Sequence, residues 1–239
     1  MSTFIEQIKA DSKNIFRDPM ISIIPFVPVL AAFALSYLIP YINTFFAIKE
    51  YYHIFAVFVI ILSPMLYSMV IGFMLLEDRD EQLLSYISIT PSGKGGYLSR
   101  KMFIPVVASF LITLISVPVS RLSPVHGFLL VFPALVSASG VPLFALFLAG
   151  FANNKVEGLA YAKGSGVLFL SILFAFFLPE PIQYIAGFIF PYYWVARVFE
   201  TVRMTEVNYL RVVIETTAGL SVNILWTYIF LRKFIKKCG

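Results

Sequence analysis

The sequence is poor in charge and has almost no cysteine. Charged residues make up 13% of its 239 residues and hydrophobic residues 59%, whereas a soluble domain has about 25% charged residues. So few charges cannot cover a soluble surface, and we therefore expect lipid to surround much of the chain. Cys238 is the single cysteine, which excludes an intrachain disulfide and a multi-cysteine metal site. The two histidines, His53 and His126, are too few to fill a zinc site.

Motifs for nucleotide binding and catalysis are missing as well. Ser92-Gly93-Lys94-Gly95 is not a phosphate-binding loop, because Ser88 stands where that motif has its first glycine and Gly95 stands where Ser or Thr should follow. Ser137 and Ser139 lie in an apolar run and are more typical of helix packing than of a nucleophile. We expect no catalytic residue, no metal site and no cofactor on this chain.

Long hydrophobic runs are what the chain does have. A helix that crosses the hydrocarbon core needs about 20 apolar residues. Five runs meet that requirement directly: residues 20–41, 54–76, 102–119, 127–150 and 212–231. A sixth, residues 159–178, is a short span, because Lys163 lies near its start and only residues 164–178 are uncharged. We therefore expect an all-α integral membrane domain of six transmembrane helices over residues 20–239.

Two further segments have an amphipathic or broken apolar pattern. In residues 1–19, apolar side chains such as Phe4 and Ile8 fall on the face opposite the basic residues, which predicts an amphipathic helix lying in the membrane interface. Residues 182–196 are apolar but short for a span, and Pro191 interrupts them. They predict a re-entrant hairpin between spans five and six, within an extracellular segment over residues 179–210. A seventh span is the alternative.

The distribution of lysine and arginine sets the orientation. With both termini in the cytoplasm, 13 of the 18 Lys and Arg residues lie inside and five outside, as the positive-inside rule requires. The inside residues are Lys9, Lys13, Arg17, Arg79, Lys94, Arg100, Lys101, Lys155, Lys163, Arg232, Lys233, Lys236 and Lys237. The outside residues are Lys49, Arg121, Arg197, Arg203 and Arg211. We expect a multi-pass plasma-membrane protein in contact with lipid, with no basic face left for nucleic acid.

The first cytoplasmic loop, residues 77–101, carries the strongest local signal. Residues 77–81 hold four acidic side chains and one arginine. Leu83, Leu84 and Ile87 follow at i, i+1 and i+4, which predicts a short amphipathic helix whose apolar face nothing else in the chain covers. An anionic membrane surface repels the acidic flank. The interpretation is therefore docking into a groove of another protein.

Ionisable residues are nearly absent from the predicted spans. Glu215, about one turn into the last span, is the main exception, and Arg211 stands four residues before it. The i, i+4 spacing favours a structural ion pair near the outer interface over a contact with substrate. The scarcity of charge at mid-membrane counts against an ion-coupled carrier.

The two cytoplasmic loops resemble those of type 2 ABC transporter permeases. In the first loop the similar segments are Asp78-Arg79-Asp80-Glu81, Leu83-Leu84, Ile89-Thr90-Pro91 and Tyr97-Leu98. In the second loop, residues 151–163, they are Asn154-Lys155-Val156-Glu157-Gly158-Leu159-Ala160 and Lys163. The second loop is especially similar to the branch of fluoroquinolone-export permeases. Gln82 departs from the family, which often has glycine there. The interfacial helix, six spans and re-entrant pair are also similar to the family's architecture.

The resemblance implies the permease subunit of an ABC exporter, in which two permease halves, identical or related chains, pair in the membrane. Separate ABC ATPase subunits carry ATP and Mg and dock on the cytoplasmic face. The coupling helix of the first loop would dock through Asp80, Glu81, Leu83, Leu84, Tyr86, Ile87, Ser88, Thr90 and Pro91. The second contact would use Asn154, Lys155, Val156, Glu157 and Gly158. The expected substrate is a hydrophobic or amphipathic drug, lipid or peptide. An ATP-independent channel or secondary carrier is the alternative.

Overall fold

The computed structural model describes residue 23 and residues 26–87, 93–125 and 127–238. Within these ranges every regular element is a helix, and six helical segments are long and apolar enough to cross a membrane. Those segments are Phe26–Asn43, Lys49–Asp80, Gly93–Ser120, Val131–Phe151, Lys155–Phe177 and Tyr209–Lys237. The expected all-α membrane class is thereby confirmed. The interfacial helix predicted over residues 1–19 lies outside the described residues.

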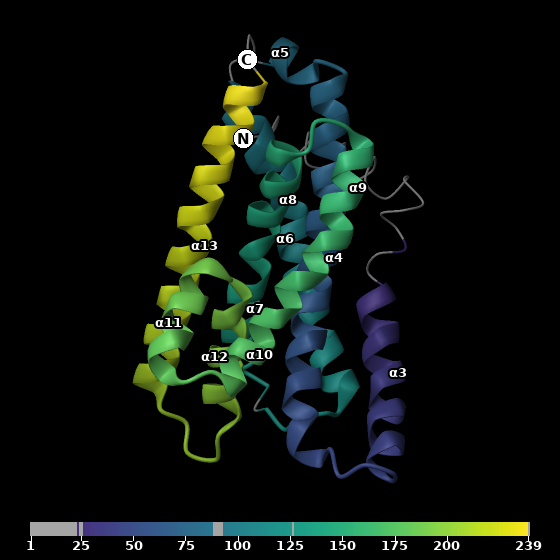
Figure 1. The fold of residues 1–239 in the computed structure, drawn as a ribbon, viewed down its shortest axis with the longest axis vertical. Helices are drawn as coiled ribbons and strands as arrows, with labels where there is room; N and C mark the ends of the chain where they lie inside the picture. Colours follow the sequence, from purple (N-terminus) through teal and green to yellow (C-terminus); the bar gives the residue numbers. More distant parts are fainter. Residues whose placement is uncertain (1–22, 24–25, 88–92, 126, 239) are drawn as a thin grey trace.

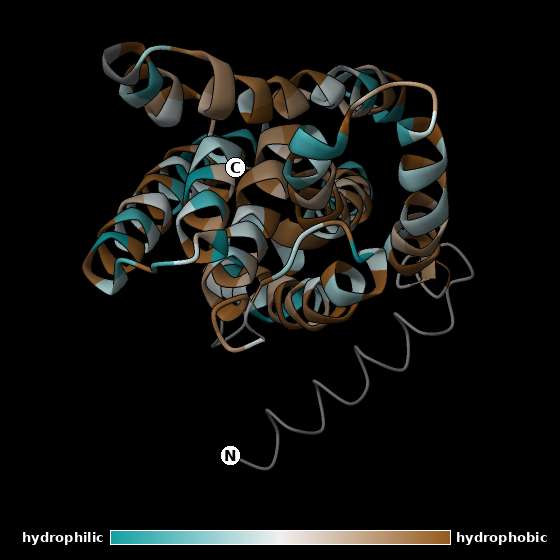
Figure 2. Ribbon diagram, turned by 90° about the horizontal axis from the view of Figure 1, so that it is seen from below, coloured by the Kyte–Doolittle hydropathy of each residue, from teal (hydrophilic) through white to brown (hydrophobic). Residues whose placement is uncertain are grey.

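One long helix forms the centre of the bundle. α4 (Tyr52–Asp80), which follows the short 3-10 turn η1 (Lys49–Tyr51), packs against α8 (Gly140–Phe151) and α6 (Gly93–Ser120). α13 (Tyr209–Lys237) packs on α8, and α3 (Phe26–Asn43) packs on α6 at the edge (Figure 1). Seen end-on, hydrophobic residues colour the outer helices as well as the inner ones (Figure 2). Large apolar side chains on α3, α6 and α13 are exposed, as lipid-facing helices require.

The fourth span is broken at Ser139, between α7 (Val131–Ala138) and α8. Pro64 in α4 lacks the N–H that would bond the carbonyl of Ile60, and Ser137 Oγ donates to that carbonyl over 3.0 Å. Asn223 Nδ2 in α13 donates to Ser139 Oγ over 2.6 Å. These serines therefore satisfy polar groups between helices, which is the packing role that their apolar setting predicts.

The fifth span changes its helical form part-way. α9 (Lys155–Gly164) passes into the 3-10 segment η2 (Ser165–Phe169), and α10 (Leu170–Phe177) completes the span. Next come two short helices, α11 (Glu180–Ile189) and α12 (Tyr192–Arg203), with a break at Pro191 where the sequence predicts one. α12 is largely buried against α7, α10 and α13, whereas α11 exposes most of its apolar side chains.

Candidate functional site

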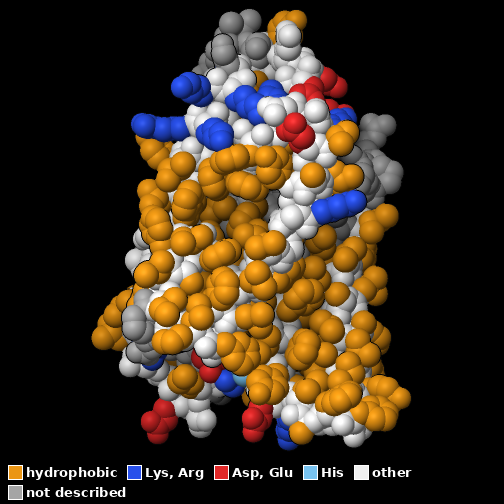
Figure 3. Space-filling model, viewed as in Figure 1, with side chains coloured by type: hydrophobic (Ala, Val, Ile, Leu, Met, Phe, Trp, Pro, Cys, Tyr) orange, Lys and Arg blue, Asp and Glu red, His pale blue; other side chains and the backbone are white. Residues whose placement is uncertain are grey.

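Charged side chains gather at one end of the bundle, above the apolar belt in Figure 3. We call this the α5 end, after the short helix α5 (Leu83–Ile87) that lies there (Figure 1). α4 continues through Asp80 and α6 begins at Gly93. The acidic segment is therefore the last turn of a spanning helix, and the connection between spans is shorter than the predicted loop over residues 77–101.

The chain turns from α4 into α5 at Gln82. This residue has φ +56°, in the left-handed region, and its N–H donates to the carbonyl of Arg79 over 3.0 Å. A left-handed conformation costs a residue other than glycine roughly 1–2 kcal/mol. The turn thus gives a physical reason for the glycine that similar permeases often have at this position.

The apolar residues of α5 do not all point the same way. Leu84 is 2% exposed and packs with Leu76 and Leu98, on α4 and α6 of the same chain. The prediction that nothing in the chain covers Leu84 is therefore wrong. Leu83 and Tyr86, 37% and 69% exposed, are the apolar side chains that α5 presents outward. Ile87 is half-buried, and the predicted docking residues Ser88, Thr90 and Pro91 lie outside the described residues.

The acidic stretch before α5 is divided between an inner and an outer role. Asp78 Oδ2 accepts a hydrogen bond from Tyr97 Oη over 2.9 Å and pairs with Lys101. Asp78 therefore binds α4 to the first turns of α6. Asp80 and Glu81 are exposed. Glu77 is exposed as well but is paired with Lys155, so Asp80 and Glu81 are the exposed acidic groups directly before α5.

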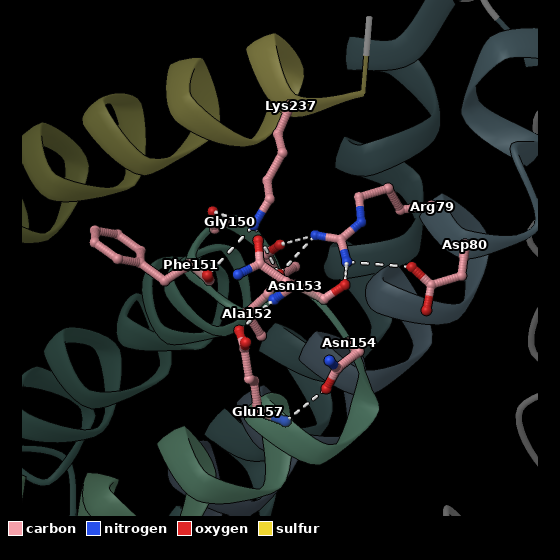
Figure 4. Close-up of polar contacts among 10 residues, drawn as sticks. Arg79, Asp80, Gly150, Phe151, Ala152, Asn153, Asn154, Glu157 and Lys237 are labelled. Carbon is pink, nitrogen blue, oxygen red and sulfur yellow. Dashed lines mark hydrogen bonds and ion pairs between the residues drawn. The ribbon is translucent and has the colours of Figure 1, made fainter.

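Arg79 ties the end of α4 to the end of α8 (Figure 4). Its Nη1 donates to the carbonyl oxygens of Ala149 and Ala152 over 3.1 and 2.7 Å, and its Nη2 donates to that of Asn153 over 2.9 Å. Nη2 also lies 3.1 Å from Asp80 Oδ1. A guanidinium suits this task because its fork of N–H donors serves several acceptors at once.

Lys237, at the end of α13, approaches the same end of α8 and shares the Ala152 carbonyl with Arg79. Its Nζ donates to Ala152, Phe151 and Gly150 over 2.8, 3.3 and 3.5 Å. The last carbonyls of a helix have no intrahelical donors and carry the negative end of its dipole. Two cations from α4 and α13 supply those donors for α8. Sequence reasoning missed this cluster, because no spacing links the three segments.

The connection between α8 and α9 is held by a reciprocal cap. Asn154 Oδ1 accepts from the N–H of Glu157 over 2.9 Å, and Glu157 Oε2 accepts from the N–H of Asn153 over 2.8 Å. Each side chain satisfies a donor that the start of a helix leaves free. Asn154 is thus the N-cap residue of α9.

The other three residues predicted for the second contact divide between surface and interior. Lys155 is exposed and pairs with Glu77 over 2.8 Å, and Val156 is 79% exposed. Gly158 is buried against α4, where an added Cβ would lie 2.7 Å from Leu76 Cδ1. Gly158 therefore allows close helix packing, while Lys155 and Val156 belong to the outer surface, where Lys155 reaches the last turn of α4.

A second polar cluster lies at the opposite end of the bundle. Glu215 is 7% exposed, with Arg211 Nε 2.9 Å from its Oε1, the pair that the i, i+4 spacing predicts. The fold adds Thr201 Oγ1 at 2.6 Å and Arg197 Nη2 at 3.7 Å, both from α12. The cluster thus binds α12 to the start of α13. Among the described residues, no group of three His, Cys, Asp or Glu side chains is placed to hold a metal ion.

The chain is similar to a family of transport proteins over most of its length. The family described as fluoroquinolones export permease protein Rv2686c-like matches residues 11–231. Fluoroquinolones export permease protein Rv2686c of Mycobacterium tuberculosis (strain ATCC 25618 / H37Rv) is 24% identical over 206 residues, covering 79% of this chain and 78% of the relative. Protein MT2760 of strain CDC 1551 / Oshkosh, with the same description, has the same values. No solved structure matches the chain.

Proposed function

Because the chain belongs to the Rv2686c-like family of fluoroquinolones export permease proteins, we propose that it is the membrane-spanning subunit of an ATP-driven exporter. A separate ATPase binds ATP and Mg and supplies the energy. The substrate is a hydrophobic or amphipathic molecule, such as the fluoroquinolones in the names of its relatives. Two permease chains pair in the membrane to enclose the path.

The observation that carries the proposal is the surface of α5. Leu83 and Tyr86 are exposed there, close in sequence to the exposed Asp80 and Glu81. An apolar pair with an acidic rim fits a groove on a partner better than a lipid headgroup layer, which repels acids. We call these four residues, together with Val156 on α9, the docking surface.

The contacts beneath the docking surface support a route by which movement of α5 is transmitted to the membrane-spanning helices. Arg79 lies one turn before α5 and is hydrogen-bonded to the end of α8 and to the α8–α9 connection. A displacement of α5 by the ATPase therefore moves α4, α8 and α9 together. α4 and α8 pack together in the interior of the bundle, so the energy of ATP hydrolysis reaches the membrane part through packed helix ends.

The positive-inside rule assigns the α5 end to the cytoplasm. In this orientation both termini are cytoplasmic, and α11 and α12 form a re-entrant hairpin that enters from outside and returns there. The test uses Cys238→Ser protein with a new cysteine at exposed Glu81 or at exposed Thr205. A membrane-impermeant maleimide should label the cysteine at 205 in intact cells and the one at 81 only in opened cells. Labelling of position 205 only after opening would make the hairpin a seventh span.

Docking is tested by purifying the complex from its native host in mild detergent. Burying one such side chain in a partner groove is worth about 1.5–3 kcal/mol, so Tyr86→Asp should weaken ATPase binding by about 10-fold or more. Tyr209→Asp is the matched control, because Tyr209 is 68% exposed and begins α13 at the opposite end. Equal ATPase recovery with both variants would refute the docking surface. A complex without ATPase that still transports would support the ATP-independent alternative.

A further inference from the structure

A cavity of about 310 Å³ lies within the bundle, and none of its lining residues belongs to the docking surface. Its walls come from α8, from α9 with η2, and from α13, and the break between α11 and α12 closes one side. α8 contacts both α9 and α13, and the surface is hollowed between the latter two in Figure 3. A volume of this size lies at the lower end of the range for small-molecule sites.

Aromatic rings dominate the lining. Phe147 of α8 lies at the centre, with its ring centroid 5.9 Å from that of Tyr161 and 5.5 Å from that of Phe230. The Phe230 ring is in turn 5.3 Å from the Trp226 ring. Trp226 Nε1 donates to the carbonyl of Phe188 over 2.8 Å, which fixes its indole in place. The rings thus form a continuous, held surface, and faces and edges of this kind favour another planar ring over a saturated chain.

The backbone departs from regular α-helix along two sides of the cavity. η2 begins directly after Gly164, and the α11–α12 break falls at Pro191, which also lines the cavity. Irregular backbone in a spanning segment persists where it borders a cavity or marks a functional hinge. A Cβ added to Gly164 would meet no atom within 4 Å, so the space beside Gly164 is open because glycine has no side chain to fill it.

We propose that this cavity is a binding site for a planar aromatic amphipathic molecule, which enters sideways from the lipid between α9 and α13. The inference rests on the proposed export function and locates the substrate for it. The rings of Phe147, Phe230 and Trp226 stack on the planar part of the molecule. The polar part stays at the rim, near the Tyr161 hydroxyl and Ser165.

The test fills the cavity without disturbing the packing. Gly164→Leu extends a side chain into it, whereas Gly166→Leu is the matched control, because Gly166 is also in open space but does not line the cavity. Equilibrium dialysis of the purified full chain, without ATPase, measures binding of a fluorescent fluoroquinolone. We expect Gly164→Leu to weaken binding on the order of tenfold or more, and Gly166→Leu to stay within about twofold. Phe147→Leu, which keeps an apolar side chain but removes the ring, should also weaken binding.

Competition binding and mass spectrometry of bound lipid distinguish an aromatic ligand from a saturated amphiphile or a lipid in the cavity. A saturated amphiphile such as cholate should fail to displace the fluoroquinolone. Unchanged binding in Gly164→Leu, or absence of binding in the wild type, would overturn the inference. So would mass spectra in which Gly164→Leu loses only a bound phospholipid, because the cavity would then hold an acyl chain. None of these results touches ATPase recovery, so the proposed export function stands or fails separately.

Discussion

Replacement of Arg79 by alanine should loosen the α5 end by an amount that the structure allows us to work out. Of the three carbonyls that Arg79 serves, Ala152 keeps Lys237 as a donor at 2.8 Å, and Asn153 is exposed to water. Ala149 is fully buried, so its carbonyl loses a charge-assisted donor, at a cost of about 1–3 kcal/mol. Loss of a cation at the negative end of the α8 dipole costs at most about 1–2 kcal/mol more. We therefore expect about 3 kcal/mol in total.

Thermal unfolding of the purified chain in mild detergent measures this cost. About 3 kcal/mol corresponds to a fall in Tm of roughly 6–12 °C for a chain of this size. Arg79→Lys should lose about half as much, because it keeps the charge but not the fork of donors. Lys155→Ala is the control, since its ion pair with Glu77 is exposed and should matter little. A Tm for Arg79→Ala within about 2 °C of the wild-type Tm would refute the reasoning.

Three further predictions test other parts of the structure. Gln82→Gly should raise stability by about 1 kcal/mol, because glycine adopts its φ of +56° without strain; a lower Tm would contradict the turn. Gly158→Val should lower the stability by about 1–3 kcal/mol, because the added side chain forces Leu76 aside. Gly164→Ala is the control and should leave the stability unchanged. Equal Tm values for the two variants would count against the close α4–α9 contact. Burial raises the pKa of the Cys238 thiol, so its reaction with maleimide at neutral pH should be slower than that of a free thiol. The reaction rate should increase with pH, with a midpoint above the ordinary pKa of a cysteine thiol. A rate equal to that of glutathione across the range would show an accessible thiol.

Length and hydropathy alone were enough to predict the spans. Twenty apolar residues in a row have no stable place in water, so the six runs predict six crossing helices regardless of how they pack. The break at Pro191 and the pairing of Arg211 with Glu215 also follow from local rules, namely the missing proline N–H and the helical spacing of four. These features depend on neighbours in the sequence, and the sequence is sufficient for them.

The direction that each side of α5 faces was decided by the tertiary structure. Leu83, Leu84 and Tyr86 are all suited to burial, and a hydrophobic pattern over five residues does not distinguish the chain's own core from a partner's groove. The turn at Gln82 rotates Leu84 onto α4 and α6 and leaves Tyr86 outside.

The polar contacts at the helix ends depend on the fold in the same way. Arg79 and Lys237 meet at the end of α8 although they are far apart in the sequence, and Arg197 reaches Glu215 from another helix. A sequence shows that each of these charges needs a partner in a medium of low dielectric constant. Which partner it finds is fixed only when the helices pack, because the carbonyls and carboxylates that accept these hydrogen bonds are brought close by the packing itself.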